Sequence, residues 1–224
     1  MGCLFASGIW WIWRHRCHEV FNPDEVWSNK KVAILARNMS FDLRNLHYNW
    51  IIYSDIKRKF KWEPSPNGTF KVNYDASVLQ GVQRASFGCV MRDDRRRWAL
   101  GRSGALPFWS VYRCELLASW QGLMLAWEVS CQRVICETDS LDAYFVLSNI
   151  TSHTTHEVKD IVLKLQDFLS KDWEVQFHLI RREANSVADW LNKSGARSDS
   201  AHVSWIKPGA DLEQILVQES TGSS

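Results

Sequence analysis

Four acidic residues in the C-terminal part of the sequence, Asp75, Glu115, Asp139 and Asp189, could together perform chemistry. Taken singly, each has an ordinary explanation, as a solvent-facing strand residue, a helix surface charge or a helix cap. If the four converge, their mutual repulsion would raise their pKa values or destabilise the fold unless cations lay among them. Carboxylate oxygens suit Mg²⁺, which keeps water ligands and accepts phosphate oxygens as well. The set therefore predicts a divalent-cation site, with separate structural roles as the alternative.

The segments that must position these acids follow from the periodicity of apolar residues. Three strands joined by short loops indicate an antiparallel meander, and the short apolar fourth strand is typical of a buried parallel strand. A meander followed by strand–helix–strand crossovers predicts an α/β fold with a five-stranded mixed sheet flanked by helices. Strands are expected over Thr69–Ser77, Ser86–Arg92, Trp98–Leu106, Arg133–Cys136 and Trp173–Ile180, and helices over 110–129, 140–148, 155–170 and from about 185.

Glu115 has the most informative setting of the four acids. Every third or fourth residue after it along the expected helix is small, so this face of the helix can approach a sheet closely. The glutamate at the head of this stripe is therefore expected to point along the sheet and not freely into water. The stripe consists of Glu115, Ala118, Ser119, Gly122 and Ala126.

Asp139 and Asp189 are the acids most easily explained by helix capping. Asp139 is followed by Ser140 at an expected helix start and could simply be a helix N-cap. Asp189 completes a Ser186-x-x-Asp189 pattern that resembles a capping box. The sequence alone leaves these capping roles open beside the metal-binding role.

Composition limits the class of protein. The 224 residues are 46% hydrophobic and 23% charged, as in a globular chain, and the net charge of +2 does not by itself indicate nucleic-acid binding. Local basic clusters occur, but such clusters are usually solvated faces. The six cysteines form no CxxC pair and are expected to be free thiols in a reducing compartment. The basic clusters are Lys57–Lys59 with Lys61, Arg95–Arg97 and Arg181–Arg182.

Four regions are expected along the chain. Residues 1–60 form a Trp-rich helical extension, residues 61–68 a linker of turn formers, residues 69–197 a compact domain, and residues 198–224 a partly disordered tail. The apolar stretch Cys3–Trp13 is too short to span a bilayer and has no basic residue before it. We therefore expect a soluble intracellular protein that does not associate with a membrane.

Five segments of the C-terminal part follow one another in a recognisable order: Lys71–Ser77, Phe87–Asp93, Cys114–Ala118, Glu137–Ser140 and Arg182–Asp189. They resemble the successive motifs of ribonuclease H type 1 domains, and most closely the reverse-transcriptase-like plant group related to retrotransposons. The resemblance covers about residues 60–195. It implies the ribonuclease H-like fold and endonucleolytic hydrolysis of the RNA strand of RNA–DNA hybrids with two metal ions, Mg²⁺ or alternatively Mn²⁺. It also implies that Asp75, Glu115, Asp139 and Asp189 are the catalytic residues and the metal ligands.

The sequence departs from that family in ways that bear on activity. The family usually has Asp-Gly where this chain has Asp75-Ala76, and alanine fits only if the backbone does not need a positive φ. Many members carry a histidine loop before the last helix. Here His178 belongs to the alternation of the fifth strand and is expected to be structural. No basic helix is inserted between Asp139 and Asp189, which weakens the expected hold on the substrate.

Three functions remain open at this stage. The first is an active ribonuclease, which the complete set of four acids favours. The second is an inactive module, domesticated from a retroelement, that binds nucleic acid such as an RNA–DNA hybrid or a structured RNA through basic clusters and exposed aromatic residues. The third is a protein-interaction module that uses the Trp-rich extension. A pure binding module gains nothing from four carboxylates facing phosphate, so we favour the first.

Overall fold

The computed structural model describes residues 61–150, 156–198 and 200–221, together with a few positions of the N-terminal part. The chain divides into two compact units, Met1–Asp55 and Ile56–Ser224. Most of the predicted helical extension, Lys57–Lys59, Cys3 and Cys17 lie outside the described residues. Within the described part of the chain, no helix is long and apolar enough to cross a membrane. The N-terminal positions described are Ile9, Ile12, Trp13, His15, Arg16, Ser28, Asn29, Lys30, Val32 and Ala33.

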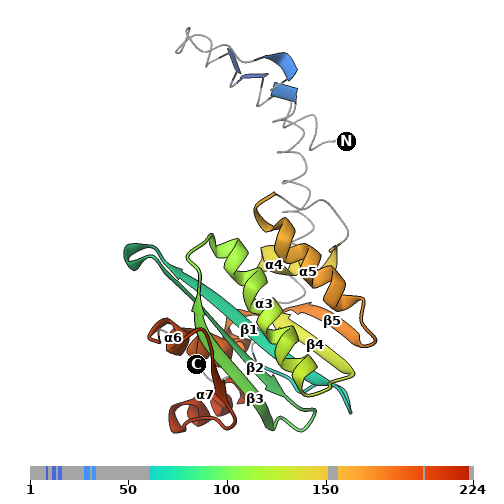
Figure 1. The fold of residues 1–224 in the computed structure, drawn as a ribbon, viewed down its shortest axis with the longest axis vertical. Helices are drawn as coiled ribbons and strands as arrows, with labels where there is room; N and C mark the ends of the chain where they lie inside the picture. Colours follow the sequence, from blue (N-terminus) through green and yellow to red (C-terminus); the bar gives the residue numbers. More distant parts are fainter. Residues whose placement is uncertain are drawn as a thin grey trace. The chain divides into compact units, whose positions relative to one another are not determined.

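The second unit contains a six-stranded mixed sheet in the order β5-β4-β1-β2-β3-β6 (Figure 1). Strand β2 is antiparallel to both β1 and β3, and β4 is parallel to both β1 and β5. These pairings confirm the predicted meander followed by parallel strands, and the sixth strand was not predicted. The strands are β1 Phe70–Leu79, β2 Arg84–Arg92, β3 Trp98–Leu106, β4 Arg133–Thr138, β5 Glu174–Leu179 and β6 Val203–Trp205.

Helices cover both faces of this sheet. Because successive strand residues point to opposite faces, Cys89 and Met91 of β2 join one apolar core, and Val90 between them joins another. The first core includes residues of α3, α4 and α5, and the second includes residues of α6 and α7. The helices are α3 Val111–Glu128, α4 Leu141–Ser148, α5 Lys159–Leu169, α6 Ser186–Ala196 and α7 Ala210–Thr221, with short 3-10 turns at Gln80–Val82, His156–Val158 and Arg182–Ala184.

Helix α3 begins and packs as its sequence predicts. Ser110 is the N-cap, and its hydroxyl accepts a hydrogen bond from the backbone N–H of Arg113 at 3.2 Å. All the small residues of the predicted stripe are buried, as is Glu115. A Cβ on Gly122 would lie 2.9 Å from Cγ1 of Val72, so the helix rests almost directly on β1. The close approach predicted for this face is confirmed.

The end of the compact unit differs from our expectation of a partly disordered tail from residue 198. Residues 203–205 instead form β6 on the edge of β3, and residues 210–221 form α7. Leu212, Ile215 and Leu216 recur at helical spacing and pack in the second core, which is the physical reason that this segment is ordered. Residue 199 and residues 222–224 lie outside the described part.

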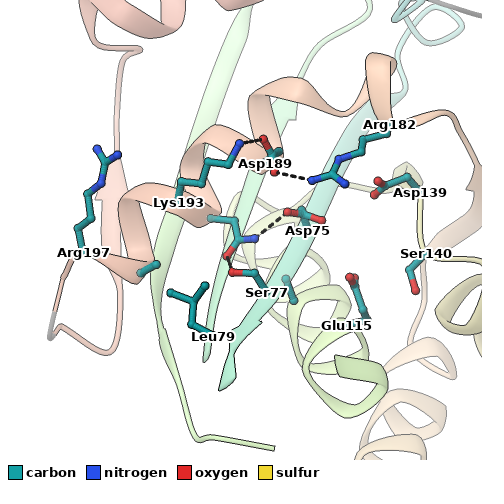
Figure 2. A pocket seen from close by; sticks show the side chains of 13 residues that line it. Asp75, Ser77, Leu79, Glu115, Asp139, Ser140, Arg182, Asp189, Lys193 and Arg197 are labelled. Atoms are coloured by element: carbon teal, nitrogen blue, oxygen red, sulfur yellow. Dashed lines mark hydrogen bonds and ion pairs between the residues drawn. The ribbon is translucent and has the colours of Figure 1, made fainter. Parts of the chain in front are cut away.

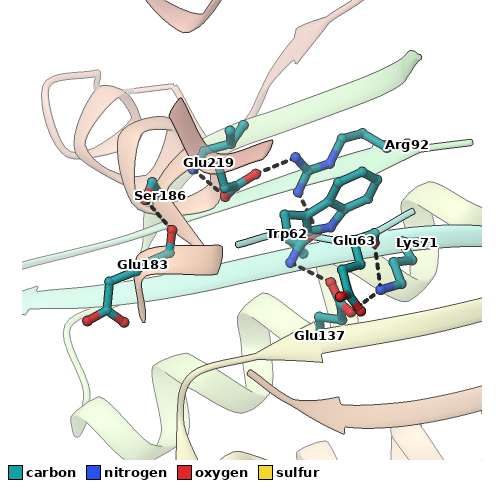
Figure 3. Close-up of polar contacts among 10 residues, drawn as sticks. Trp62, Glu63, Lys71, Arg92, Glu137, Glu183, Ser186 and Glu219 are labelled. Carbon is teal, nitrogen blue, oxygen red and sulfur yellow. Dashed lines mark hydrogen bonds and ion pairs between the residues drawn. The ribbon is translucent and has the colours of Figure 1, made fainter. Parts of the chain in front are cut away.

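A buried polar network links the segment before β1 to the sheet (Figure 3). The Asn73 side chain accepts a hydrogen bond from Nε1 of Trp62 at 3.0 Å and donates one to Glu137 at 3.0 Å. Lys71 forms an ion pair with Glu137 at 2.5 Å and donates to the backbone carbonyl of Glu63 at 2.9 Å. These contacts satisfy polar groups inside the fold, where an unpaired charge would cost several kcal/mol (about 3–5).

The same network extends to the last helix. Arg92 forms an ion pair with Glu219 of α7, donates to Asn73 at 2.7 Å, and stacks on Trp62 with 3.8 Å between the guanidinium carbon and the ring centroid. Glu219 also accepts from the backbone N–H of Val187 at 3.2 Å. The network therefore ties both α7 and the start of α6 to the sheet.

Helix α6 lies against β2 at a glycine. A Cβ on Gly88 would be 2.2 Å from the backbone nitrogen of Asn192 and 2.5 Å from the carbonyl oxygen of Ala188. We therefore expect Gly88→Ala to push α6 away and to lower the free energy of unfolding by about 3 kcal/mol. The control is Gly81→Ala, whose added methyl group meets no atom within 4 Å and should change stability by less than about 0.5 kcal/mol. Urea unfolding measures both, and equal stabilities would contradict the close packing.

Candidate active site

All four predicted acids line one cavity of about 500 Å³ (Figure 2). Asp75 comes from β1, Glu115 from the first turns of α3, Asp139 from the junction of β4 with α4, and Asp189 from the first turn of α6. The elements that carry them are distant in sequence but adjacent in the fold. The structure thus brings the four acids to the same pocket.

The capping explanations for Asp139 and Asp189 do not match the contacts. Ser140 is the N-cap of α4, which leaves the Asp139 carboxylate available to the pocket. At α6, the residue in the cap position is Asn185, and its side chain makes no capping hydrogen bond. The Asp189 carboxylate instead pairs with Lys193 at 2.5 Å and with Arg182 at 3.5 Å. Both acids therefore face the pocket for reasons other than capping.

Two asparagines hold two of the acids, and sequence reasoning did not single them out. Asn185 donates to Asp139 at 2.8 Å and to the backbone carbonyl of Tyr74 at 3.1 Å. Asn192 donates to Asp75 at 2.7 Å. The two lie seven residues apart, which is close to two helical turns and puts them on the same side of α6. Asn185 lies four residues before Asp189 and Asn192 three residues after it. This spacing is the signal in the sequence that places them on the side of Asp189, although it does not show which acid each one contacts.

The pocket holds more negative charge than its surroundings balance. Burial, followed by the charge of Asp139, raises the pKa of Asp75 to about 7. Burial also raises the pKa of Glu115 well above its usual range, with Asp75 as the next cause. The pKa of Asp139 is raised, again mainly by burial. Oε2 of Glu115 is buried without a hydrogen-bond partner. Such a set of carboxylates favours a bound cation or a bound proton.

Basic side chains border one side of the same pocket. Arg182, Lys193 and Arg197 line it, and the Arg182 and Lys193 side chains are 77% and 62% exposed. Among the basic clusters that lie in the described part of the chain, Arg181–Arg182 contributes Arg182 to this border. Arg95–Arg97 lie instead at the turn between β2 and β3, where Arg97 pairs with Asp93 at 2.7 Å. The pocket therefore joins an acidic floor to a cationic rim.

The donor set fits hard divalent cations by its chemistry. Carboxylate oxygens are the ligands that Mg²⁺ and Mn²⁺ prefer, and waters usually complete their coordination. Within residues 61–150, 156–198 and 200–221, no three acidic, histidine or cysteine side chains lie close enough together to hold one ion by themselves. Any ion here would therefore take part of its coordination shell from water or from a phosphate.

The departures noted in the sequence have clear structural outcomes. Ala76 does not adopt a positive φ, so alanine is accommodated where the family usually has glycine. The exposed His178 lies on β5 and does not line the pocket. Four cysteines, Cys89, Cys114, Cys131 and Cys136, are buried free thiols, as expected.

Comparisons with known proteins agree with this architecture. The model of a family described as reverse transcriptase-like matches residues 73–195. A protein of Arabidopsis thaliana named "Putative ribonuclease H protein" is 28% identical over 227 residues, which cover 99% of this chain but 36% of the relative. The RNase H1 of Halobacterium salinarum superposes with a TM-score of 0.53 at 13% identity, covering 57% of this chain and 96% of that one.

A second solved structure, LC11-RNase H1 in complex with an RNA/DNA hybrid, gives a TM-score of 0.52 at 16% identity. It covers 57% of this chain and 96% of its own. At these identities the likeness concerns the fold, and the predicted ribonuclease H-like architecture is confirmed. This chain spans 36% of the length of the curated relative that it matches.

The raised pKa of Asp75 has a consequence for stability. A carboxyl group with a pKa of 3.8 when unfolded and about 7 when folded holds its proton more tightly in the fold, so stability falls as pH rises between these values. In EDTA at pH 8, Asp75→Asn should therefore be more stable than the parent. The gain should be at most about 4 kcal/mol, and less where water screens the carboxylate.

Thermal unfolding of the parent and Asp75→Asn from pH 4 to pH 8 measures this difference. The gain should vanish at the acid end of the range, and Mg²⁺ should stabilise the parent more than the variant. A variant no more stable than the parent at pH 8 would show that the Asp75 carboxylate carries no electrostatic cost in the fold.

Proposed function

We propose, from the premise that this chain belongs to the reverse transcriptase-like family, that it is a metal-dependent endoribonuclease acting on the RNA strand of RNA–DNA hybrids. The observation that carries the proposal is the pocket itself, which four carboxylates line and in which the pKa values of Asp75, Glu115 and Asp139 are raised. A purely structural role does not explain these carboxylates, because burying several of them side by side lowers the stability of the fold. A site that binds cations together with a phosphate makes use of that charge.

Asp75, Glu115, Asp139 and Asp189 would hold the divalent ions, Mg²⁺ or Mn²⁺. When bound, such a pair of ions supplies activation of the attacking water and stabilisation of the leaving 3′ oxygen. The protein's own residues keep the ligands in place. Asn185 holds Asp139, and the Ser140 cap fixes the start of α4 beside it. Lys193 and Arg182 balance Asp189, the acid that lies nearest the rim cations.

The cationic rim is suited to the sugar–phosphate backbone of the substrate. Arg182, Lys193 and Arg197 border the pocket on the side where α6 passes, and a phosphate directed at the acids would lie beside them. Recognition of a hybrid of this kind depends on backbone and 2′-hydroxyl contacts across a shallow minor groove and not on base edges. LC11-RNase H1, which shares the fold, binds an RNA/DNA hybrid in its crystal.

A non-catalytic nucleic-acid-binding module is the second candidate. One observation favours it: in the described part of the chain, no three acidic, histidine or cysteine side chains lie close enough together to hold a metal ion. In that case the rim would bind the nucleic acid and the acids would hold no catalytic ion. The two candidates differ in whether bound substrate is cut.

Cleavage of a labelled RNA–DNA hybrid in Mg²⁺ by the full chain tests the proposal. Asp75→Asn and Asp139→Asn should each lower the rate by more than about 100-fold, which exceeds the usual cost of losing a group that only orients a ligand. Asp167→Asn, which removes an exposed carboxylate on α5, is the matched control and should cut at the parent rate. Binding without cleavage by the parent, over a range of metal and salt concentrations, would select the second candidate.

The rim predicts a specific salt dependence. In EDTA, Arg197→Ala should weaken hybrid binding and reduce the slope of log affinity against log salt by about 0.9, the value for one lost phosphate contact on a duplex. Arg95→Ala removes an equal charge from the turn between β2 and β3 and should leave the slope unchanged. Fluorescence anisotropy at several salt concentrations measures both, and equal slopes for the two variants would remove the rim from the binding site.

A further inference from the structure

Asn192 of α6 makes a set of contacts that the proposed function does not yet use. Its side-chain nitrogen donates to Oδ2 of Asp75 at 2.7 Å. Its side-chain oxygen accepts from the hydroxyl groups of Ser86 at 2.6 Å and Ser77 at 3.1 Å. The residue is 1% exposed and lines the pocket. A buried carboxamide thus connects one of the four acids to two serines of β1 and β2.

The orientation of this carboxamide follows from the chemistry of its neighbours. An ionised carboxylate can only accept hydrogen bonds, so the NH₂ end of Asn192 must face Asp75. The oxygen end then faces Ser77 and Ser86, whose hydroxyl groups can donate. Each end of the amide has a suitable partner, and reversing it would place two acceptors against each other.

The main chain beneath Asn192 is equally constrained. A Cβ on Gly88 would lie only 2.2 Å from the backbone nitrogen of Asn192. Gly88 is itself the residue of β2 that pairs with Asp75 of β1. Helix α6 therefore packs on β2 at Gly88, the residue next to Asp75 in the sheet. Asn192 is held by its own packing and cannot follow a rotating carboxylate. The hydrogen bond between the two therefore fixes the orientation of the Asp75 carboxylate.

We propose that Asn192 is a positioning residue, which holds one oxygen of Asp75 so that the other oxygen is directed at the cation site. This inference rests on the proposed function, since it assigns Asp75 a metal ligand's role. A carboxylate whose orientation is set in advance loses less conformational freedom when an ion binds. Groups that orient metal ligands in this way typically account for 10- to 100-fold in metal affinity or activity. Ser86 acts one step further out, by holding Asn192.

The test measures Mn²⁺ binding to the full chain by titration calorimetry, without any substrate. Asn192→Ala should weaken binding about tenfold or more, and Ser86→Ala should weaken it less but in the same direction. Ser86→Ala is a small change that keeps the buried volume nearly constant, so it reports on the same contact if Asn192→Ala does not fold. Asn67→Ala removes an exposed asparagine in the turn before β1 that does not line the pocket, and it should leave Mn²⁺ affinity unchanged.

Hybrid cleavage gives a second measurement. Asn192→Ala should need about tenfold more Mg²⁺ for half-maximal rate while KM for the hybrid stays the same, a separation that a general loss of packing would not produce. Unchanged Mn²⁺ affinity in both Asn192→Ala and Ser86→Ala, with weakened binding in Asp75→Asn, would overturn the role of Asn192 alone. Unchanged affinity in Asp75→Asn would overturn the metal site on which the inference rests.

Discussion

The closeness of α6 to the sheet is the constraint on which the pocket depends. Gly88 has no side chain, and the backbone of α6 at Ala188 and Asn192 occupies the space where a side chain would lie. At this separation, short side chains on the helix reach the carboxylates on the neighbouring strands. An asparagine spans the gap from α6 to Asp75 in a single hydrogen bond of 2.7 Å. A larger spacing would require longer side chains, which are held in place less firmly.

The electrostatics of the pocket follow from this packing. Closely packed elements exclude water, and loss of water is the first cause of the raised pKa values of Asp75, Glu115 and Asp139. The fold relieves part of that cost with amide donors, and it places cations on the rim rather than against the buried acids. The remaining negative charge is what an incoming cation would neutralise. The stability cost of burying these carboxylates and their proposed affinity for metal have the same physical origin.

The C-terminal segment belongs to this architecture even though it lies outside the matched residues 73–195. Glu219 of α7 pairs with Arg92 of β2 and also accepts a hydrogen bond from the first turn of α6. Trp62 covers the same arginine from the segment before β1. These contacts support the start of the helix that carries Asp189, through the buried network of Lys71, Asn73, Arg92, Glu137, Glu219 and Trp62. The two ends of this unit contribute to holding α6 in place.

The order of the elements and the small-residue face of α3 could be obtained from the sequence, because apolar periodicity and small-residue spacing are local patterns. The four candidate acids were obtained from their places in these elements and from the resemblance to ribonuclease H domains. The strand Trp98–Leu106 has the bounds that these patterns predict, and the helix expected from residue 110 begins at Val111, directly after its N-cap Ser110. The sequence did not indicate that β6 and α7 join the unit. Their few apolar residues are explained only by their packing against Val90 and Leu191, which are distant in the sequence. Nor could it identify Asn185 and Asn192 as the partners of Asp139 and Asp75. Those contacts join residues more than 40 positions apart, and only the tertiary packing of α6 on the sheet sets their distances.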